Sequence, residues 1–197
     1  MSPPFPSRTE LRRELRGRRR ALSLFTQRIA ARQLAQKLRA LPALKSARHV
    51  ALYWPNDGEI DPRQLCRLTR RQQFYLPVLH ACPADTLRFV RWRPGMRLTR
   101  NRFCIPEPHP AHSRPARAMD VILLPLVGFD AQGNRLGMGG GFYDRTLAFL
   151  HRVPRPRPLL VGVAHACQQV DTMAAASWDV PLAMIVTDKK VIRPGKS

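Results

Sequence analysis

The chain has 197 residues, 44% of them hydrophobic, which suits a single globular domain with a sizeable core. No apolar run approaches the ~20 residues that a membrane-spanning helix needs, and the basic N-terminus lacks the apolar segment of a secretory signal. We therefore expect a cytoplasmic protein with no membrane partner. The net charge of +21 is compatible with nucleic acid, a membrane surface or a small polyanion. Because aromatic residues make up only 7% of the chain, too few for an obvious base-stacking surface, a small polyanion fits at least as well as a nucleic acid.

The N-terminal part of the chain is predicted to be helical after a short tail. Residues 1–8 hold three prolines and are expected to be disordered. Thr9 is a candidate N-cap for a helix that runs to about Leu41, with a break near Ser23. Apolar residues recur through this segment at helical spacing and form one face: Leu11, Leu15, Leu22, Ile29, Leu34 and Leu38.

Six arginines crowd the first half of this predicted helix, between residues 12 and 20. A solvated basic face is the ordinary interpretation of such a run. The alternative concerns Arg12 and Arg16, which are four residues apart and therefore share one helix face. Two guanidinium groups placed in this way could bind the same phosphate.

A strand is predicted over residues 49–54, followed by a turn over 55–58. Glu59 comes directly after this turn, and a helix over 61–72 follows it. Open α/β sheets place ligand contacts just beyond the carboxyl ends of their strands, which is where Glu59 lies. A solvated loop acid is an equally good interpretation from the residues alone.

Five further segments have the apolar or alternating pattern of strands, at residues 73–79, 86–92, 121–124, 159–164 and 184–187. Most of them are separated by helices or by segments of crossover length. We therefore predict an α/β fold in which a mostly parallel sheet is covered by helices on both faces. The expected organisation is one three-layer domain over residues 9–190, followed by a C-terminal tail at 191–197.

The most informative segment is NRLGMGGGFYD, residues 134–144, which lies between the strand at 121–124 and a predicted helix over 144–152. Its clustered glycines can reach positive φ and let backbone N–H groups approach an anion. Arg135 would add a forked cation. The segment has neither a Walker lysine nor the G-x-G-x-x-G spacing, so a flexible turn is the alternative interpretation.

Residues 135–144, RLGMGGGFYD, closely resemble the signature of the 5-formyltetrahydrofolate cyclo-ligase family, also called methenyltetrahydrofolate synthetase. This signature is long and mixed in chemistry, which makes the match specific. Weaker similarity to the family extends from about Arg12 to Thr187. The resemblance implies a ligase of one-carbon metabolism that acts on 5-formyltetrahydrofolate and ATP with magnesium, and we expect a monomer.

The resemblance implies an ATP site that combines the N-terminal helix with the glycine segment. The family carries a Lys-x-x-x-Arg pair that contacts ATP, and Arg12 and Arg16 stand at its two positions, with arginine in place of lysine. Catalytic roles are implied for Arg135, Tyr143 and Asp144. The other implied ATP contacts are Leu136, Gly137, Met138, Gly139, Gly140, Gly141 and Phe142, with Arg135 and Tyr143 contributing again.

Folate and metal contacts are also implied by the resemblance. The folate side takes Trp54 and Glu59, together with Met138, Phe142 and Gln168. Magnesium is assigned to Asp144 and Asp179. The family often has a second aspartate four residues after the latter, where this chain has Ala183, so phosphate oxygens and water would supply most of the metal ligands.

Taken together, these features predict the ATP-dependent conversion of 5-formyltetrahydrofolate to 5,10-methenyltetrahydrofolate, with release of ADP and phosphate. The formyl oxygen would be phosphorylated, and a folate nitrogen would then close the ring. One alternative is a basic nucleic-acid-binding protein whose glycine loop is structural, which would bind nucleic acid with a steep salt dependence. Another keeps the fold but changes the substrate, as in a sugar-phosphate isomerase or a CoA-transferase relative.

Overall fold

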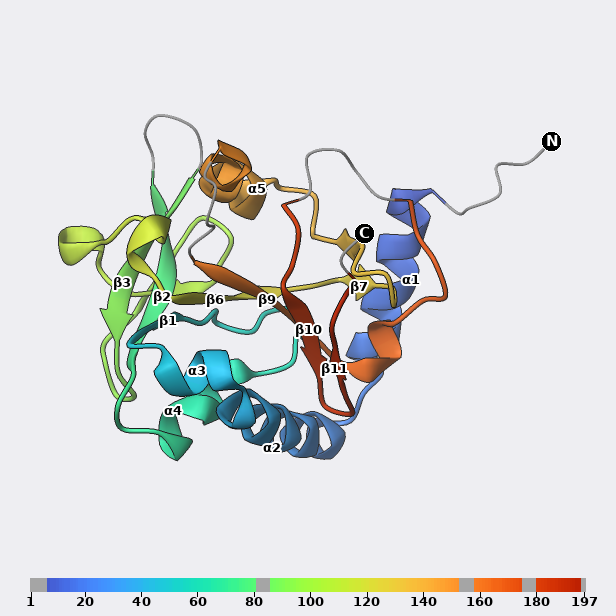
Figure 1. Cartoon of the computed structure of the whole chain (residues 1–197), viewed down its shortest axis with the longest axis horizontal. Helices are drawn as coiled ribbons and strands as arrows, with labels where there is room; N and C mark the ends of the chain where they lie inside the picture. Colours follow the sequence, from blue (N-terminus) through green and yellow to red (C-terminus); the bar gives the residue numbers. More distant parts are fainter. Residues whose placement is uncertain (1–6, 81–85, 153–157, 175–179, 196–197) are drawn as a thin grey trace.

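The computed structural model describes residues 7–80, 86–152, 158–174 and 180–195. Its centre is a seven-stranded sheet with the order β11-β10-β9-β6-β1-β2-β3 (Figure 1). The five strands from β10 to β2 run parallel to one another, whereas β11 and β3 at the two edges are antiparallel to their neighbours. The prediction of a mostly parallel α/β sheet is confirmed.

The strands of the main sheet are β1 His49–Ala51, β2 Gln73–His80, β3 Thr86–Trp92, β6 Val121–Pro125, β9 Leu159–Ala164, β10 Met184–Thr187 and β11 Val191–Ile192. Two small hairpins stand apart from this sheet, β4 Thr99–Arg100 with β5 Pro106–Glu107, and β7 Gly128–Phe129 with β8 Arg135–Leu136. Strand β11 lies within residues 191–197, which were predicted to be a tail. It forms because the apolar residues Val191 and Ile192 pair with Val186 and Ile185 at the sheet edge.

The helices are α1 Arg8–Arg20, α2 Leu24–Ala40, α3 Pro42–Ser46, α4 Leu65–Leu68 and α5 Phe142–Leu147. Short 3-10 helices are η1 Pro62–Gln64, η2 Pro110–His112, η3 Ala116–Ala118, η4 Ala148–Arg152 and η5 Ala166–Gln168. Helices α2, α3 and α4 cover one face of the sheet, and α5 covers the other (Figure 1). Within the described ranges, no helix has both the length and the apolar character that a bilayer span requires.

Two cores explain this three-layer arrangement. Successive residues of a strand point to opposite faces of a sheet, and in β6 Leu123 packs with α2 while Ile122 packs with α5 and η4. Both residues are fully buried. The continuous apolar run of β6 therefore reflects burial on both faces, as expected of a central parallel strand.

The N-terminal helical segment breaks where it was predicted to, at Ser23, whose Oγ accepts a hydrogen bond from the Thr26 N–H at 3.1 Å and caps α2. The prediction of Thr9 as the first cap is wrong. Ser7 caps α1 instead, because its Oγ accepts from the Glu10 N–H at 3.2 Å while the Glu10 carboxylate accepts from the Ser7 N–H at 3.0 Å. This reciprocal capping box requires a glutamate three residues after the cap, which Thr9 does not have.

Candidate active site

A cavity of about 1180 Å³ lies at the carboxyl ends of the central strands. Its walls come from the segment that follows β1, the end of β6, the glycine segment and the first half of α1. Segments that are more than a hundred residues apart in the chain therefore share one hollow. Parallel strands produce this convergence because all their carboxyl ends meet at one edge of the sheet.

The glycine segment has a backbone shape that other residues would not adopt easily. Gly139 has a φ of +97° and Gly141 a φ of +66°, and Gly141 precedes the first residue of α5. The neighbouring carbonyl groups are held by arginine side chains, since Arg12 Nε donates to the Gly137 oxygen and Arg145 Nη2 donates to the Gly140 oxygen, each at 2.9 Å. Two carbonyl groups of the loop are thus tied to arginine side chains from α1 and α5.

Arg135 and Asp144 form an ion pair at the base of this loop. The guanidinium of Arg135 is buried, with 5% of the residue exposed, and it donates through Nη1 to the Val180 oxygen at 2.7 Å and through Nη2 to the Asp144 carboxylate. Both residues line the cavity. Asp144 keeps 30% of its side chain exposed, so this carboxylate can still face a ligand.

Arg12 and Arg16 are separated by their partners. Arg12 lies against the glycine segment and lines the cavity. Arg16 Nε instead donates to Asp57 Oδ2 at 2.7 Å, and Arg16 is not among the residues that line the cavity. The two side chains share a helix face, as predicted, but only Arg12 lines the cavity.

Two polar groups with little solvent exposure line the cavity from different segments, the Glu59 carboxylate from the turn after β1 and the Tyr143 hydroxyl from the start of α5. Burial raises the pKa of Glu59 from 4.5 to about 7, although the nearby Arg19 guanidinium opposes the shift. Burial also raises the pKa of Tyr143 well above its ordinary value, and the Glu59 charge adds to this. The Tyr143 hydroxyl has no hydrogen-bond partner among the described residues. A buried donor without a partner is costly in a folded protein and is a candidate for a ligand contact.

Aromatic rings close the cavity at two places. Trp54 packs edge-on against Trp92 with ring centroids 6.2 Å apart, and the Arg63 guanidinium stacks on its ring at 3.8 Å. Phe142 is met edge-on by Phe103, whose ring is 5.6 Å away. Trp54, Phe103 and Phe142 all line the cavity, which supplies flat apolar walls for an aromatic ligand.

Comparison with known proteins gives this cavity a context. The family model for the 5-formyltetrahydrofolate cyclo-ligase family matches residues 5–188. The chain is 41% identical to the 5-formyltetrahydrofolate cyclo-ligase of Escherichia coli over 182 residues, which are 90% of this chain and 98% of that protein. It is 38% identical to the enzyme of the same name from Haemophilus influenzae, with 89% and 94% covered. The chain belongs to the 5-formyltetrahydrofolate cyclo-ligase family.

The fold agrees with this assignment. The NMR structure of the 5,10-methenyltetrahydrofolate synthetase of Aquifex aeolicus superposes with a TM-score of 0.80 and 32% identity, covering 96% of this chain and 95% of that one. The resemblance inferred from residues 135–144 is confirmed, and the protein is an enzyme of this cyclo-ligase family. The relatives named here do not support the alternative of a nucleic-acid-binding protein.

Besides Arg16, two predicted ligand contacts of this family member do not line the cavity. Leu136 is buried in the hairpin strand β8, where it packs with Leu11 and Leu15 of α1. Gln168 is buried as well, and its amide donates to the Leu126 and Val127 oxygens at 2.7 and 2.9 Å while its oxygen accepts from the His165 N–H. The side chain of Gln168 thus holds the segment that follows β6.

The predicted metal ligands are only partly described. Asp179 lies outside the described residues, and Asp144 is ion-paired with Arg135. Among residues 7–80, 86–152, 158–174 and 180–195, no three His, Cys, Asp or Glu side chains gather as a metal cage would require. One accessible carboxylate is the donor set expected when a magnesium ion is held mainly by phosphate oxygens and water.

The sequence prediction missed Arg19 and Asp57. Arg19 was grouped with a solvated basic face, yet the residue is fully buried. Asp57 was counted only as part of a turn, yet its carboxylate is ion-paired with Arg16, Arg19 and Arg20. The acidic residue in the Asn-Asp-Gly turn was the available signal, because a basic run this dense needs a carboxylate wherever one of its members is buried.

The raised pKa of Glu59 predicts a specific pH dependence of stability. Between about pH 4.5 and pH 7 the unfolded chain has lost the Glu59 proton whereas the folded protein retains it, so this residue makes folding less favourable as the pH rises. Urea unfolding of the wild type and of Glu59→Gln at pH 5, 6, 7 and 8 measures the contribution. As the pH rises, we expect the free energy of unfolding of Glu59→Gln to increase relative to that of the wild type by up to a few kcal/mol, since one pKa unit corresponds to about 1.4 kcal/mol. A difference in free energy between the two proteins that does not vary with pH would contradict the raised pKa of Glu59.

Proposed function

We propose that this family member converts 5-formyltetrahydrofolate to 5,10-methenyltetrahydrofolate with hydrolysis of ATP to ADP and phosphate. The observation that carries the proposal is the single cavity of about 1180 Å³, which joins the glycine segment to Glu59 and Tyr143. Sites for one small ligand usually measure about 300–1,000 Å³. A cavity of this size, with both cationic and aromatic side chains in its walls, suits two substrates held side by side.

The chemistry asks the protein mainly to position two reactants. The formyl oxygen attacks the terminal phosphorus of ATP and ADP leaves, which converts this oxygen into a phosphate leaving group. The neighbouring folate nitrogen then bonds to the formyl carbon and loses its proton, and phosphate departs. Phosphoryl transfer relies on alignment and charge neutralisation more than on covalent participation of the enzyme.

The residues divide between the two substrates according to their charge. Arg12 and the backbone N–H groups around Gly139 to Gly141 would bind the ATP phosphates, and Arg135 would orient Asp144 beneath them. Magnesium, entering with ATP, would neutralise phosphate charge, and Asp144 would hold it from the protein side. Glu59 would accept hydrogen bonds from the pterin.

At the junction of the two substrates, Tyr143 would donate its hydroxyl proton to an oxygen of the reacting groups. Trp54 and Phe142 would pack against the flat folate rings. Arg16 is not assigned to ATP in this proposal, because Asp57 engages it. The same pairing supports a small-molecule function over a nucleic-acid one, since part of the basic run is neutralised inside the protein.

The test follows the absorbance of the methenyl product when purified protein meets 5-formyltetrahydrofolate, with and without ATP and magnesium. We expect a rise that requires the protein, ATP and magnesium together, with one ADP formed for each product molecule. Asp144→Ala should suppress the rise. A flat trace from protein shown to be folded by circular dichroism would overturn the proposed function, and salt-dependent binding to nucleic acid would then be the next measurement.

A further inference from the structure

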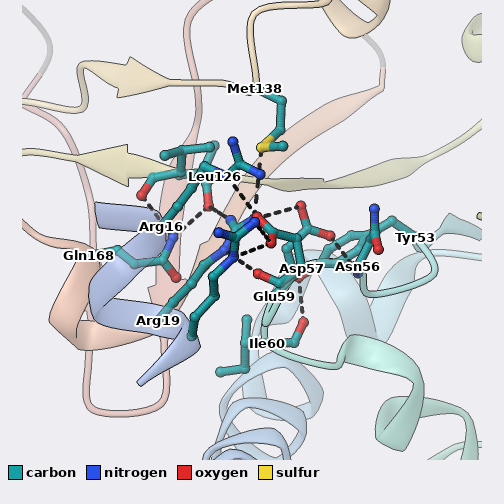
Figure 2. A network of polar contacts seen from close by, with 12 residues as sticks. Arg16, Arg19, Tyr53, Asn56, Asp57, Glu59, Ile60, Leu126, Met138 and Gln168 are labelled. Carbon is teal, nitrogen blue, oxygen red and sulfur yellow. Dashed lines mark hydrogen bonds and ion pairs between the residues drawn. The ribbon is translucent and has the colours of Figure 1, made fainter. Parts of the chain in front are cut away.

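One buried guanidinium connects the main walls of the cavity. Arg19, in the last turn of α1, is fully buried. Its Nε donates to the backbone oxygen of Asp57 at 2.8 Å and its Nη1 to the backbone oxygen of Leu126 at 3.4 Å. Its Nη2 donates to the carboxylate oxygen Oδ2 of Asp57 at 2.9 Å. The same Nη2 lies 3.8 Å from Glu59 Oε1 and 3.8 Å from the Met138 sulfur (Figure 2). A single side chain thus contacts the turn after β1, the end of β6 and the glycine segment.

The turn that carries Glu59 needs such support. Asp57 has a φ of +53° and Gly58 a φ of +77°, two consecutive residues in the left-handed region. A non-glycine residue in this region costs on the order of 1 kcal/mol or more and persists where its surroundings hold it. A Cβ on Gly58 would lie 3.3 Å from the Arg19 oxygen. The turn is therefore fitted closely to Arg19, and its shape decides where Glu59 points.

We infer that Arg19 is a positioning residue, which favours the charged form of the Glu59 carboxylate and holds it directed at the pterin side of the cavity. The inference rests on the proposed function, in which Glu59 accepts hydrogen bonds from the folate. Arg19 does not line the cavity and would not touch either substrate. Its effect on the reaction would pass through the neighbouring carboxylate.

The charges around Glu59 support this role. Burial pushes the pKa of Glu59 upward, and Arg19 is the largest influence in the opposite direction, followed by the Asn56 N–H hydrogen bond. Asp57 raises this pKa further, and Arg16 lowers it. From the start of α5, the neutral phenol of Tyr143 lies near the carboxylate, and so does Tyr53, whose hydroxyl donates to the Ile60 oxygen at 2.6 Å.

Removal of Arg19 should leave the Glu59 carboxyl mostly protonated at neutral pH. With a pKa of about 7, Glu59 is partly ionised at neutral pH in the wild type. Without the guanidinium its pKa must rise, and a rise of one unit lowers the ionised fraction about fivefold at pH 7 and hardly at all at pH 9. A protonated carboxyl accepts fewer hydrogen bonds, so the loss of folate binding should be greatest near neutral pH and should diminish as the pH rises.

The experiment compares the wild type with Arg19→Met from pH 6.5 to 9. We expect the KM for 5-formyltetrahydrofolate to rise about fivefold at pH 7 and less than about twofold at pH 9, with a smaller change in kcat at saturating folate. The dissociation constant of the folate, measured without ATP by quenching of tryptophan fluorescence, should follow the same pH profile. A fold-increase in KM that is equal at every pH would mean a merely structural role and would overturn the inference.

Arg20→Met is the matched control, because Arg20 follows Arg19 in the chain and also pairs with Asp57, but it is half exposed and, within the described residues, forms no ion pair with Glu59. It should leave the pH profile of the KM unchanged. In a Glu59→Gln background, Arg19→Met should raise the KM by much less than in the wild type, since interacting residues are not additive. Equal increases in the two backgrounds would contradict the inference.

If Arg19→Met does not fold, Arg19→Lys serves in its place, because lysine keeps the charge but cannot keep all of the contacts of the guanidinium. A smaller pH-dependent rise of the KM is then expected, and a pH profile of the KM identical to that of the wild type would contradict the inference.

Two further outcomes distinguish a failure of the inference from a failure of the proposed function. If the wild type forms no methenyl product, the proposed function fails. If it turns over normally and only the pH signature is missing, the positioning role fails alone.

Discussion

Replacing Gly139 with alanine is expected to lower kcat/KM for ATP by about 100-fold. The φ of +97° at this position is one that L side chains rarely adopt, and the added Cβ would also lie 3.6 Å from the Arg12 guanidinium. The backbone must therefore change where N–H groups are to meet phosphate. A misplacement of about 1 Å in a reacting group can cost 10²-fold in rate.

Gly95→Ala is the control for this substitution. Gly95 has a similar φ of +83°, no atom within 4 Å of an added Cβ and no part in the cavity. Both variants should lose on the order of 1 kcal/mol of stability through backbone strain, but only Gly139→Ala should lose activity. Gly137 lies in the same segment at a negative φ, so Gly137→Ala should lose much less activity than Gly139→Ala. Equal activity losses in the two strained variants would show that stability and not phosphate binding is responsible.

Tyr143→Phe should lower kcat/KM by about 10- to 100-fold while leaving the stability unchanged or slightly increased. The hydroxyl is buried without a partner in the described part of the chain, so its removal relieves a desolvation cost. In the substrate complex the same hydroxyl would donate to a charged oxygen, and such bonds contribute about 1.5–3 kcal/mol. Steady-state kinetics and urea unfolding of the same preparations measure both effects.

Tyr53→Phe provides the contrasting case. The Tyr53 hydroxyl donates to the Ile60 oxygen at 2.6 Å, so its loss should reduce stability by about 1 kcal/mol. A loss of stability in Tyr53→Phe but not in Tyr143→Phe would distinguish a hydroxyl that stabilises the fold from one that is available to a ligand. Should Tyr143→Phe be destabilised as much as Tyr53→Phe and retain full activity, the role proposed for Tyr143 would be wrong.

Most of the secondary structure follows from local chemistry. The apolar run of β6 was predicted from its residues, because a strand buried on both faces has no polar positions. The break between α1 and α2 follows from Ser23, whose hydroxyl satisfies the first free N–H groups of α2. The glycine segment was recognisable because few other residues permit its backbone angles. Family membership, too, could be inferred from residues 135–144.

The site itself depended on contacts between distant segments. Helical spacing places Arg19 on the same face of α1 as Leu11 and Leu15, but only the packing of α1 against the turn after β1 supplies the carboxylate that meets the buried Arg19, while Arg20 stays exposed. In the same way, Arg12 faces the glycine segment while Arg16, one helical turn later, meets Asp57. Spacing determines which side chains share a helix face, but the partner that reaches each of them from elsewhere in the chain decides its ionisation, its burial and its role.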